Sequence, residues 1–227
     1  MSRLFHVSEA CEQMGLRAGA VVFRNAEILA ADAELNELIY KTIKEKNYHK
    51  ISNAEIKKIP EIERLHEIFR KSGVNPNRYP PSNERLIRSA SKTGRIPTIN
   101  SFVDAYNFIS LKTLCTLGAH DMERLSFPIS LSLTAGNESF IPLGQNEKLK
   151  IDSGEFAYID AENRIICRMD LLQAEFSKVT DKTENVLLII EGTDIMDRYY
   201  FERVFEETIS LITGQTRASY DIIAYPI

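Results

Sequence analysis

The feature that most constrains this chain is a change in the spacing of its apolar residues near Asp121. Before that point, apolar residues recur at intervals of three and four, as on the buried face of a helix. After it, they form short runs separated by Gly, Asn and Asp, as in strands joined by turns. Because a further helical pattern follows these runs, the sequence predicts an α+β fold.

Helix boundaries are marked by capping residues in the first half of the chain. Asp32 is a good N-cap, Pro60 is suited to a first helical position, and Gly73 is suited to the turn that follows a helix. We expect four helices here, which begin at Asp32, Pro60, Ser82 and Ser101 and end near residue 44, at Gly73, at Gly94 and at Leu114.

Strands are expected mainly in the second half. The strand-like runs cover residues 129–134, 139–143, 156–160, 164–169 and 186–191, and one or two more strands are expected before residue 31. A long helix is expected over about residues 194–213, ending at Gly214. Residues 219–227 can then return as an edge strand, where Pro226 is tolerated.

The segment 75–81 contains three prolines and cannot form regular structure. It is therefore the expected domain boundary. Residues 1–74 are expected to form an N-terminal α/β extension, largely helical, packed on a core formed by residues 75–227.

Composition excludes several functional classes. The 227 residues contain no apolar stretch long enough to span a membrane, and the N-terminal residues lack the apolar core of a signal peptide. We therefore expect a soluble, cytoplasmic protein. The formal net charge of -4 argues against a DNA-binding protein, so any contact with RNA must be local. The spacing of cysteines and histidines matches no metal site, so neither a metal nor another cofactor is expected. The sequence does not indicate an oligomeric state.

A stripe of polar residues runs along the helix expected over residues 101–114. Asn100, Asp104 and Asn107 follow at intervals of four and three, and Ser110 lies one turn further. The rest of this helix is apolar, so these polar groups must be hydrogen bonded or face a cavity. A structural network and the wall of a pocket both fit this pattern.

Asp104 is expected to be at least half buried, because its neighbours in sequence are apolar. A buried carboxylate needs a partner, and Arg95, Arg168 or backbone N–H groups could supply one. This places Asp104 in a structural role and not as a general base. Asp104→Asn is then expected to lower stability more than any hydrolytic rate.

Three further polar residues lie in apolar surroundings. Arg168 and Glu191 stand at the ends of apolar runs, where a charged residue is usually solvated, although either could reach a ligand. His120 is a lone histidine beside an expected cap, and such a residue is more often structural than catalytic.

An ordered series of motifs extends the argument beyond single residues. It comprises Pro80-Pro81-Ser82-Asn83-Glu84, Arg95-x-Pro97-x-x-Asn100-x-x-x-Asp104-x-Tyr106-Asn107-x-x-Ser110-Leu111, Gly118-Ala119-x-Asp121, Pro142-Leu143-Gly144, Gly154-Glu155, Tyr158-x-Asp160, Cys167-Arg168, Val179-Thr180-x-x-Thr183 and Glu191-Gly192. The series resembles the B3/B4 editing module of the phenylalanyl-tRNA synthetase beta subunit, and looks closer still to its free-standing relatives. It covers about residues 75–213, whereas residues 1–74 match only loosely.

The resemblance implies a mixed or antiparallel β-sandwich-like core flanked by helices, with a pocket for the aminoacyl-adenosine end of tRNA. In the synthetase, such a pocket hydrolyses tyrosyl-tRNA that was charged in error. The implied reaction is attack of a positioned water on the aminoacyl ester, with hydrogen-bond donors stabilising the oxyanion. It requires neither a metal nor a covalent nucleophile.

Two positions depart from the synthetase pattern. Gly118 stands where the module has a pocket histidine, and Ile189 stands where it has a glutamate that recognises the tyrosine hydroxyl. A tyrosine hydroxyl would lose its partner, so specificity for tyrosine is not implied. The chain also shows no recognisable site for ATP-dependent aminoacylation.

Three hypotheses remain open from sequence. The preferred one is hydrolysis of mischarged aminoacyl-tRNA in trans, with the 3′ end of tRNA as partner. The second is a non-catalytic module that binds tRNA ends, an amino acid or a related metabolite, and the third is a structural domain without an open pocket. Candidate pocket residues are Arg95, Asn100, Asp104, Tyr106, Asn107, Ser110, His120, Arg168 and Glu191, and candidate tRNA contacts are Arg78, Arg85, Arg88 and Lys92.

Overall fold

The fold is seen in a computed structural model that describes residues 4–226. The α-helices are α1 (Glu9–Met14), α2 (Ala33–Glu45), α3 (Asn53–Ile56), α4 (Pro60–Lys71), α5 (Ser82–Thr93), α6 (Ser101–Thr113) and α7 (Arg198–Thr216). The strands are β1 (Phe5–Val7), β2 (Leu16–Arg24), β3 (Thr116–Asp121), β4 (Ile129–Leu133), β5 (Phe156–Ile159), β6 (Ile165–Arg168), β7 (Leu172–Gln173), β8 (Val186–Thr193) and β9 (Ser219–Ala224). This confirms the predicted α+β class.

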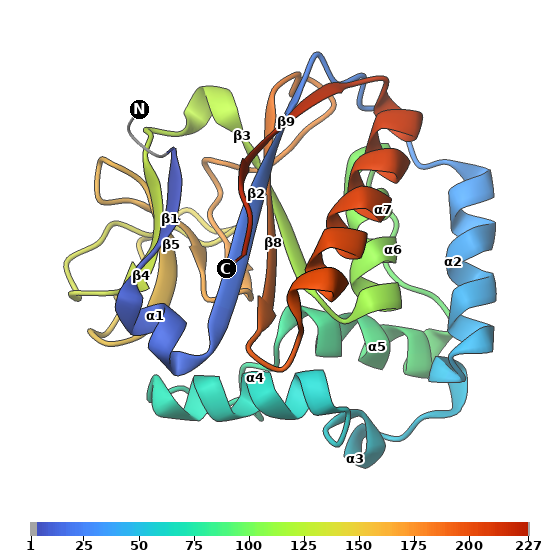
Figure 1. Cartoon of the computed structure of the whole chain (residues 1–227), viewed down its shortest axis with the longest axis horizontal. Coiled ribbons are helices and arrows are strands. Elements are labelled where there is room, and N and C mark those ends of the chain that lie inside the picture. The colour runs from blue at the N-terminus through green and yellow to red at the C-terminus, as the bar shows by residue number, and fades with distance from the viewer. Residues whose placement is uncertain (1–3, 227) are drawn as a thin grey trace.

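The strands described in residues 4–226 form two sheets, which lie beside each other as two layers (Figure 1). One has five strands in the order β1-β4-β5-β6-β7, with β1 parallel to β4 and the other pairs antiparallel. The other has four strands in the order β3-β8-β2-β9 and is antiparallel throughout. Helices α6 and α7 form a third layer on the far side of the four-stranded sheet, and α2 lies outside them.

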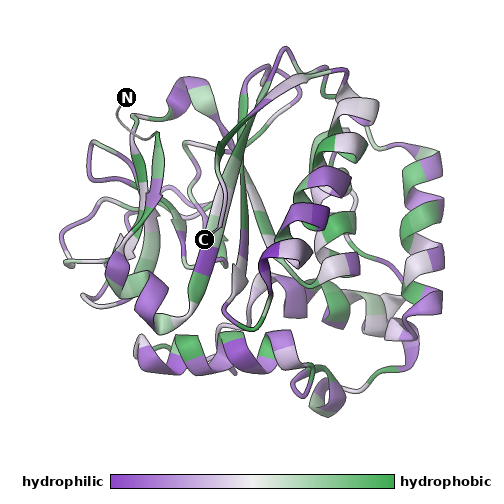
Figure 2. Ribbon diagram, viewed as in Figure 1, coloured by the Kyte–Doolittle hydropathy of each residue, from purple (hydrophilic) through white to green (hydrophobic). Residues whose placement is uncertain are grey.

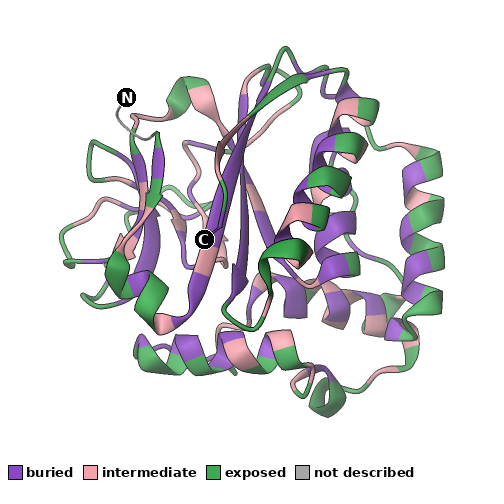
Figure 3. Ribbon diagram, viewed as in Figure 1, coloured by how far each residue is buried: buried purple, intermediate pink, exposed green. Residues whose placement is uncertain are grey.

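Alternating side chains of β2 supply the two cores on either side of the four-stranded sheet. Val21 and Phe23 face the helices and pack with Phe102 of α6, whereas Ala20 and Val22 face the five-stranded sheet. Figure 2 shows apolar residues along these inner strands, and Figure 3 shows that the same strands are buried. A sheet covered on both faces requires near-continuous apolar strands, as β2 and β8 are.

Capping residues fix several helix ends as predicted. The Asp32 side chain accepts a hydrogen bond from the N–H of Leu35 at 2.7 Å, and Pro60 is the first residue of α4. Helix α4 ends at Lys71, and Gly73 follows with a φ of +76°. Helix α5 has Ser82 as its first residue, in agreement with the predicted start.

Other boundaries correct the sequence-based prediction. Helix α7 begins four residues later than residue 194, because the Asp197 side chain caps it, and it continues through Gly214 to Thr216. Residues 139–143 form only isolated bridges. Strand β3 lies between residue 114 and Asp121, where no strand was predicted. The edge strand predicted after residue 219 is confirmed as β9, while Ile227 lies outside the described residues.

Residues 1–74 share both sheets with the remainder of the chain. Strand β2 lies between β8 and β9, and β1 pairs with β4. The division into residues 1–74 and 75–227 stays a prediction. Among the helices of residues 4–226, none combines the length and apolar character needed to cross a membrane.

Candidate functional site

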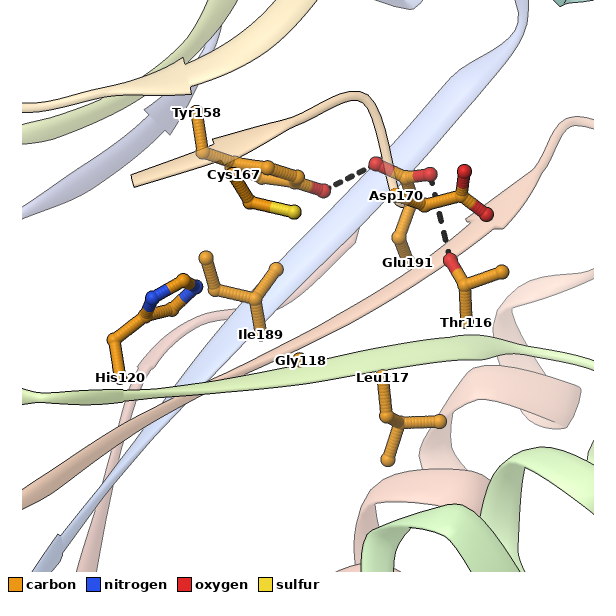
Figure 4. A pocket seen from close by; sticks show the side chains of 9 residues that line it. All are labelled: Thr116, Leu117, Gly118, His120, Tyr158, Cys167, Asp170, Ile189 and Glu191. Carbon is orange, nitrogen blue, oxygen red and sulfur yellow. Dashed lines mark hydrogen bonds between the residues drawn. The ribbon is translucent and has the colours of Figure 1, made fainter. Parts of the chain in front are cut away.

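A small cavity lies between the two sheets, at the β3 side of the four-stranded sheet (Figure 4). Its volume is about 30 Å³, enough for one or two water molecules. We call it the inner cavity. The residues that line it are Thr116, Leu117, Gly118, His120, Tyr158, Cys167, Asp170, Ile189 and Glu191.

The pairing of β3 with β8 explains why these side chains converge. Thr116 lies opposite Glu191 and Gly118 lies opposite Ile189, and residues paired across two strands point to the same face of the sheet. A Cβ added at Gly118 would meet no atom within 4 Å, so this glycine leaves space in the wall of the cavity. Gly118 and Ile189, the two positions that depart from the synthetase pattern, are therefore cross-strand neighbours in the wall of the inner cavity.

Glu191 is buried at the end of β8 and is held by two hydroxyl groups. The Tyr158 hydroxyl donates to one carboxylate oxygen, and the Thr116 hydroxyl lies 3.4 Å from the other. Burial, together with the charge of Asp170, raises the pKa of Glu191 to about 8. Surface placement, the commoner position for a strand-end charge, is therefore wrong for Glu191.

Asp170 follows β6 and provides the second carboxyl group of the inner cavity. Within residues 4–226, neither of its oxygens has a hydrogen-bond partner of normal geometry, although both are buried. Burial raises the pKa of Asp170 to about 7, while the Ser82 N–H, the Thr116 hydroxyl and the Arg85 charge favour its ionised form. Because the charge of one carboxyl group affects the other, Asp170 and Glu191 titrate together near neutral pH. We call them the carboxyl pair.

The remaining polar groups of the inner cavity are neutral. Nδ1 of His120 is hydrogen bonded to the Ser177 hydroxyl at 3.0 Å, and burial lowers the pKa of His120 to about 3. Burial also raises the pKa of the Cys167 thiol well above its usual range. Neither residue is thus poised as a base or a thiolate nucleophile at neutral pH.

A second, larger hollow of about 320 Å³ lies on the helix side of β3. We call it the outer groove. Its lining comes from α5, α6, β3 and the turn between the two helices: Ser82, Arg85, Leu86, Ser89, Pro97, Asn107, Ser110 and Leu117. Leu117 lines both hollows, so the inner cavity and the outer groove meet at this residue of β3.

Three residues of the predicted polar stripe have two different roles: one caps α6, and two line the outer groove. The Asn100 side chain caps the helix by accepting from the N–H of Val103 at 2.9 Å. Asn107 and Ser110 line the outer groove. Tyr106 is half-buried against Phe102, outside both hollows.

Asp104 is buried as expected, and of the partners expected for it, a backbone N–H and not an arginine is the one found. One carboxylate oxygen accepts from the N–H of Ile99 at 2.8 Å, and the other has no partner among residues 4–226. Burial raises the pKa of Asp104. Arg95 is exposed, and Arg168 is held elsewhere.

Arg168 is buried and forms a bidentate ion pair with Glu155, at 2.5 and 2.7 Å. Its guanidinium also lies over the Tyr79 ring, 5.6 Å from the centroid. Surface placement is therefore wrong for Arg168 as well, yet it does not line either hollow. A buried charge that is fully paired in this way stabilises a local structure and is not available to a ligand.

The four candidate tRNA contacts lie on and before α5. Arg78, Arg85 and Lys92 are exposed, and Arg85 lines the outer groove. Arg88 is partly buried and pairs with Glu84, whose other oxygen contacts His66. Three basic side chains are therefore available on this side of the molecule.

Sequence reasoning missed five residues of the inner cavity: Thr116, Leu117, Tyr158, Cys167 and Asp170. Tyr158 and Cys167 stand inside quoted motifs, which could have nominated them. Asp170 had no local signal beyond a carboxylate next to an apolar pair of leucines. In the part of the chain that the structure describes, no cluster of three or more His, Cys, Asp and Glu side chains could hold a metal ion.

Comparison with known proteins places this arrangement in a family. A similar protein, the phenylalanine–tRNA ligase beta subunit of Malacoplasma penetrans (strain HF-2), is 27% identical over 101 residues, which are 44% of this chain and 13% of that protein. A crystal structure of an N-terminal fragment of the phenylalanyl-tRNA synthetase beta subunit from Pyrococcus horikoshii matches with a TM-score of 0.51 and 11% identity. The matched region covers 95% of this chain and 49% of that fragment, and the two share the same fold. The chain thus spans less than half of either relative.

The family model described as the B3/4 domain matches residues 65–212, which include α5, α6 and all residues of the inner cavity and outer groove. This match extends over more than half of the chain. The protein therefore belongs to the B3/4 domain family.

Proposed function

We propose that this protein hydrolyses the ester bond of mischarged aminoacyl-tRNA in trans, without catalysing aminoacylation itself. The observation that carries the proposal is the carboxyl pair of Asp170 and Glu191 in the inner cavity. Their pKa values of about 7 and about 8 lie near neutrality, where a general base is most effective. Family membership and the name of the Malacoplasma penetrans relative support an aminoacyl-tRNA substrate.

The chemistry requires a water and one ionised carboxylate. Among residues 4–226, no hydrogen bond of normal geometry occupies either oxygen of Asp170, so it is the group that can accept a proton from a bound water. Glu191 can hold the shared proton, because burial gives it the higher pKa of the two carboxyl groups. The activated water attacks the ester carbonyl carbon, the bond to the ribose oxygen breaks, and that oxygen takes the proton to give a free hydroxyl.

In this proposal, the outer groove binds the nucleotide end of the tRNA. It is ten times larger than the inner cavity and contains polar side chains of Arg85, Asn107 and Ser110. The exposed Arg78 and Lys92 extend the positive charge toward the tRNA backbone. A net charge of -4 requires such local contacts, because the molecule as a whole does not attract polyanions.

A second candidate is binding without hydrolysis. The observation that favours it is the outer groove, which at about 320 Å³ has room for a small ligand and has, among the described residues that line it, no carboxyl group that could act as a base. The ligand would then be a small metabolite or the aminoacyl end of tRNA. Turnover separates the two candidates.

The test is a deacylation assay with a panel of mischarged tRNAs, each labelled on the amino acid. Wild type is expected to release at least one amino acid faster than buffer does. Asp170→Asn and Glu191→Gln are expected to lose most of this rate, on the order of 100-fold or more. Asp104→Asn is the matched control, because it removes a buried carboxylate outside both hollows.

Release at the uncatalysed rate for every tRNA would refute hydrolysis. A salt-sensitive affinity for tRNA, weakened by reversing the charges of Arg78, Arg85 and Lys92, would then support the binding module. Equal loss of rate in Asp104→Asn and Asp170→Asn would show that the carboxyl pair has no specific role.

A further inference from the structure

The outer edge of β3 runs between the inner cavity and the outer groove. Strand β3 is an edge strand of the four-stranded sheet, where it pairs only with β8. The edge of β3 that faces away from β8 therefore has main-chain N–H and C=O groups that are not used within the sheet. At Leu117, these groups lie between the inner cavity and the outer groove.

Two hydrogen bonds establish which residues face outward. The C=O of Ala119 accepts from Nε2 of Gln173 at 2.7 Å, and the N–H of Asp121 donates to the C=O of Ser177 at 2.9 Å. In an antiparallel pair, the N–H and C=O of one residue point to the same side, and alternate residues point the same way. Leu117, two residues before Ala119, therefore directs both its N–H and its C=O away from β8.

Leu117 is distinguished from its neighbours by having both groups available. Ala119 and Asp121 each use one of these groups, and Cys115 uses both in bonds with nearby side chains. Within residues 4–226, no hydrogen bond reaches the N–H or the C=O of Leu117. Its side chain packs in the core on the helix side, as Figure 4 illustrates, so its main chain lines the inner cavity.

We propose that the main chain of Leu117 binds the α-amino acid part of the ligand as a one-residue antiparallel strand. The Leu117 N–H donates to the carbonyl oxygen of the aminoacyl ester, and the Leu117 C=O accepts from its α-ammonium group. An α-amino acid ester carries these two groups with the spacing of one strand residue, which suits a closely spaced antiparallel pair. Leu117 would thus recognise any ligand with an α-amino acid part. That this ligand is an ester rests on the proposed function.

The surroundings of Leu117 fit the remaining parts of such a ligand. The carboxyl pair of Asp170 and Glu191 lies in the same cavity and attracts an ammonium group. Gly118 leaves space for a small side chain, and the outer groove lies on the helix side for the adenosine. The N–H that binds the carbonyl oxygen in the ground state also stabilises the oxyanion that forms when water attacks.

The direct test is amide hydrogen exchange measured by NMR on the wild-type protein. The probes are 3′-deoxy-3′-(aminoacylamino)adenosines carrying alanyl, seryl or phenylalanyl groups, in which an amide replaces the ester. A bound probe is expected to slow exchange at Leu117 about tenfold or more, and to leave the β8-bonded amide of Gly118 unchanged. The matched probe without the α-amino group is expected to bind about tenfold more weakly.

A variant pair isolates the main-chain donor. Leu117→Pro removes the N–H, and because that N–H points away from β8, the ladder between the two strands is kept. Leu117→Ala removes the side chain and keeps the donor. Leu117→Pro is expected to bind the probes about tenfold more weakly than Leu117→Ala. If Leu117→Pro does not fold, the exchange experiment on the wild type decides.

The outcomes separate this inference from the proposed function. Protection of Leu117 without deacylation would support the site and refute hydrolysis. Deacylation without protection of Leu117, or equal affinity of the two Leu117 variants, would overturn the site and leave hydrolysis standing. Failure of every probe to bind the wild type at millimolar concentration would also overturn it.

Discussion

Replacing Asp170 by Asn is expected to stabilise the fold at neutral pH, although it removes a group proposed to be essential for activity. Folding raises the pKa of this carboxyl from an ordinary value of 3.8 to about 7. The ionised form therefore costs the folded state about 4 kcal/mol at and above pH 7, since a tenfold change in an equilibrium constant is about 1.4 kcal/mol. Asparagine carries no such charge.

The net gain is smaller than this upper limit, because an amide without hydrogen-bond partners still costs about 1–3 kcal/mol. We expect roughly 2 kcal/mol, or a rise in Tm of about 4–8 °C for a chain of this size. The sign depends on pH. Well below the ordinary pKa of 3.8, both the folded and the unfolded carboxyl are protonated, so the variant and the wild type should be equally stable. The advantage of the variant should grow between about pH 4 and about pH 7, where the unfolded carboxyl is ionised and the folded one is still protonated, and should level off above about pH 7.

Urea unfolding of wild type and Asp170→Asn at intervals between pH 4 and pH 9 measures this difference. Asp181→Asn, the same substitution at an exposed position, serves as the control. A difference that stays constant with pH, or a variant less stable than wild type at pH 8, would refute the reasoning. Either result would mean that the Ser82 N–H, the Thr116 hydroxyl and the Arg85 charge stabilise the ionised carboxyl of Asp170 enough to offset its burial.

Three further predictions follow from the packing of the site. Gly118→Val should change stability by less than about 1 kcal/mol, because its side chain enters open space, but should weaken ligand binding at least about tenfold; thermal melts and calorimetry check both. Arg168→Gln should cost about 3–5 kcal/mol in urea unfolding, because Glu155 is left buried and unpaired, and adding Glu155→Gln should recover part of the loss. Asp104→Asn should lower stability by no more than about 1 kcal/mol, because the amide oxygen keeps the bond from Ile99, and should lower the hydrolytic rate less; a variant that melts like wild type yet loses turnover would contradict the structural role expected from sequence.

Local signals predicted the parts of the fold that depend on neighbouring residues. The cap at Asp32 and the first helical position of Pro60 are contacts within one turn, so the sequence contains all the information they require. Strand β3 was not predicted, since Gly118 and the following residues resemble a turn when read alone. The chain adopts a strand there because β8 pairs with it along its whole length.

The site was harder to predict than the fold because it is assembled from distant segments. Glu191 and His120 were named from sequence and lie in the inner cavity, whereas Asn107 and Ser110 were named and lie in the outer groove. Asp170 was not named. Its role arises from its position beside Glu191 across the two sheets, and no periodicity within a single segment encodes a contact of that kind.

The position of β2 has a consequence for how the chain folds during synthesis. Its partners β8 and β9 emerge from the ribosome roughly 170 residues or more after β2 itself, so the central sheet has a high contact order. Until then, the apolar faces of β2 have no sheet to join. The nascent chain is therefore expected to expose an aggregation-prone strand for most of translation, and to depend on chaperones more than a helical bundle of the same length would.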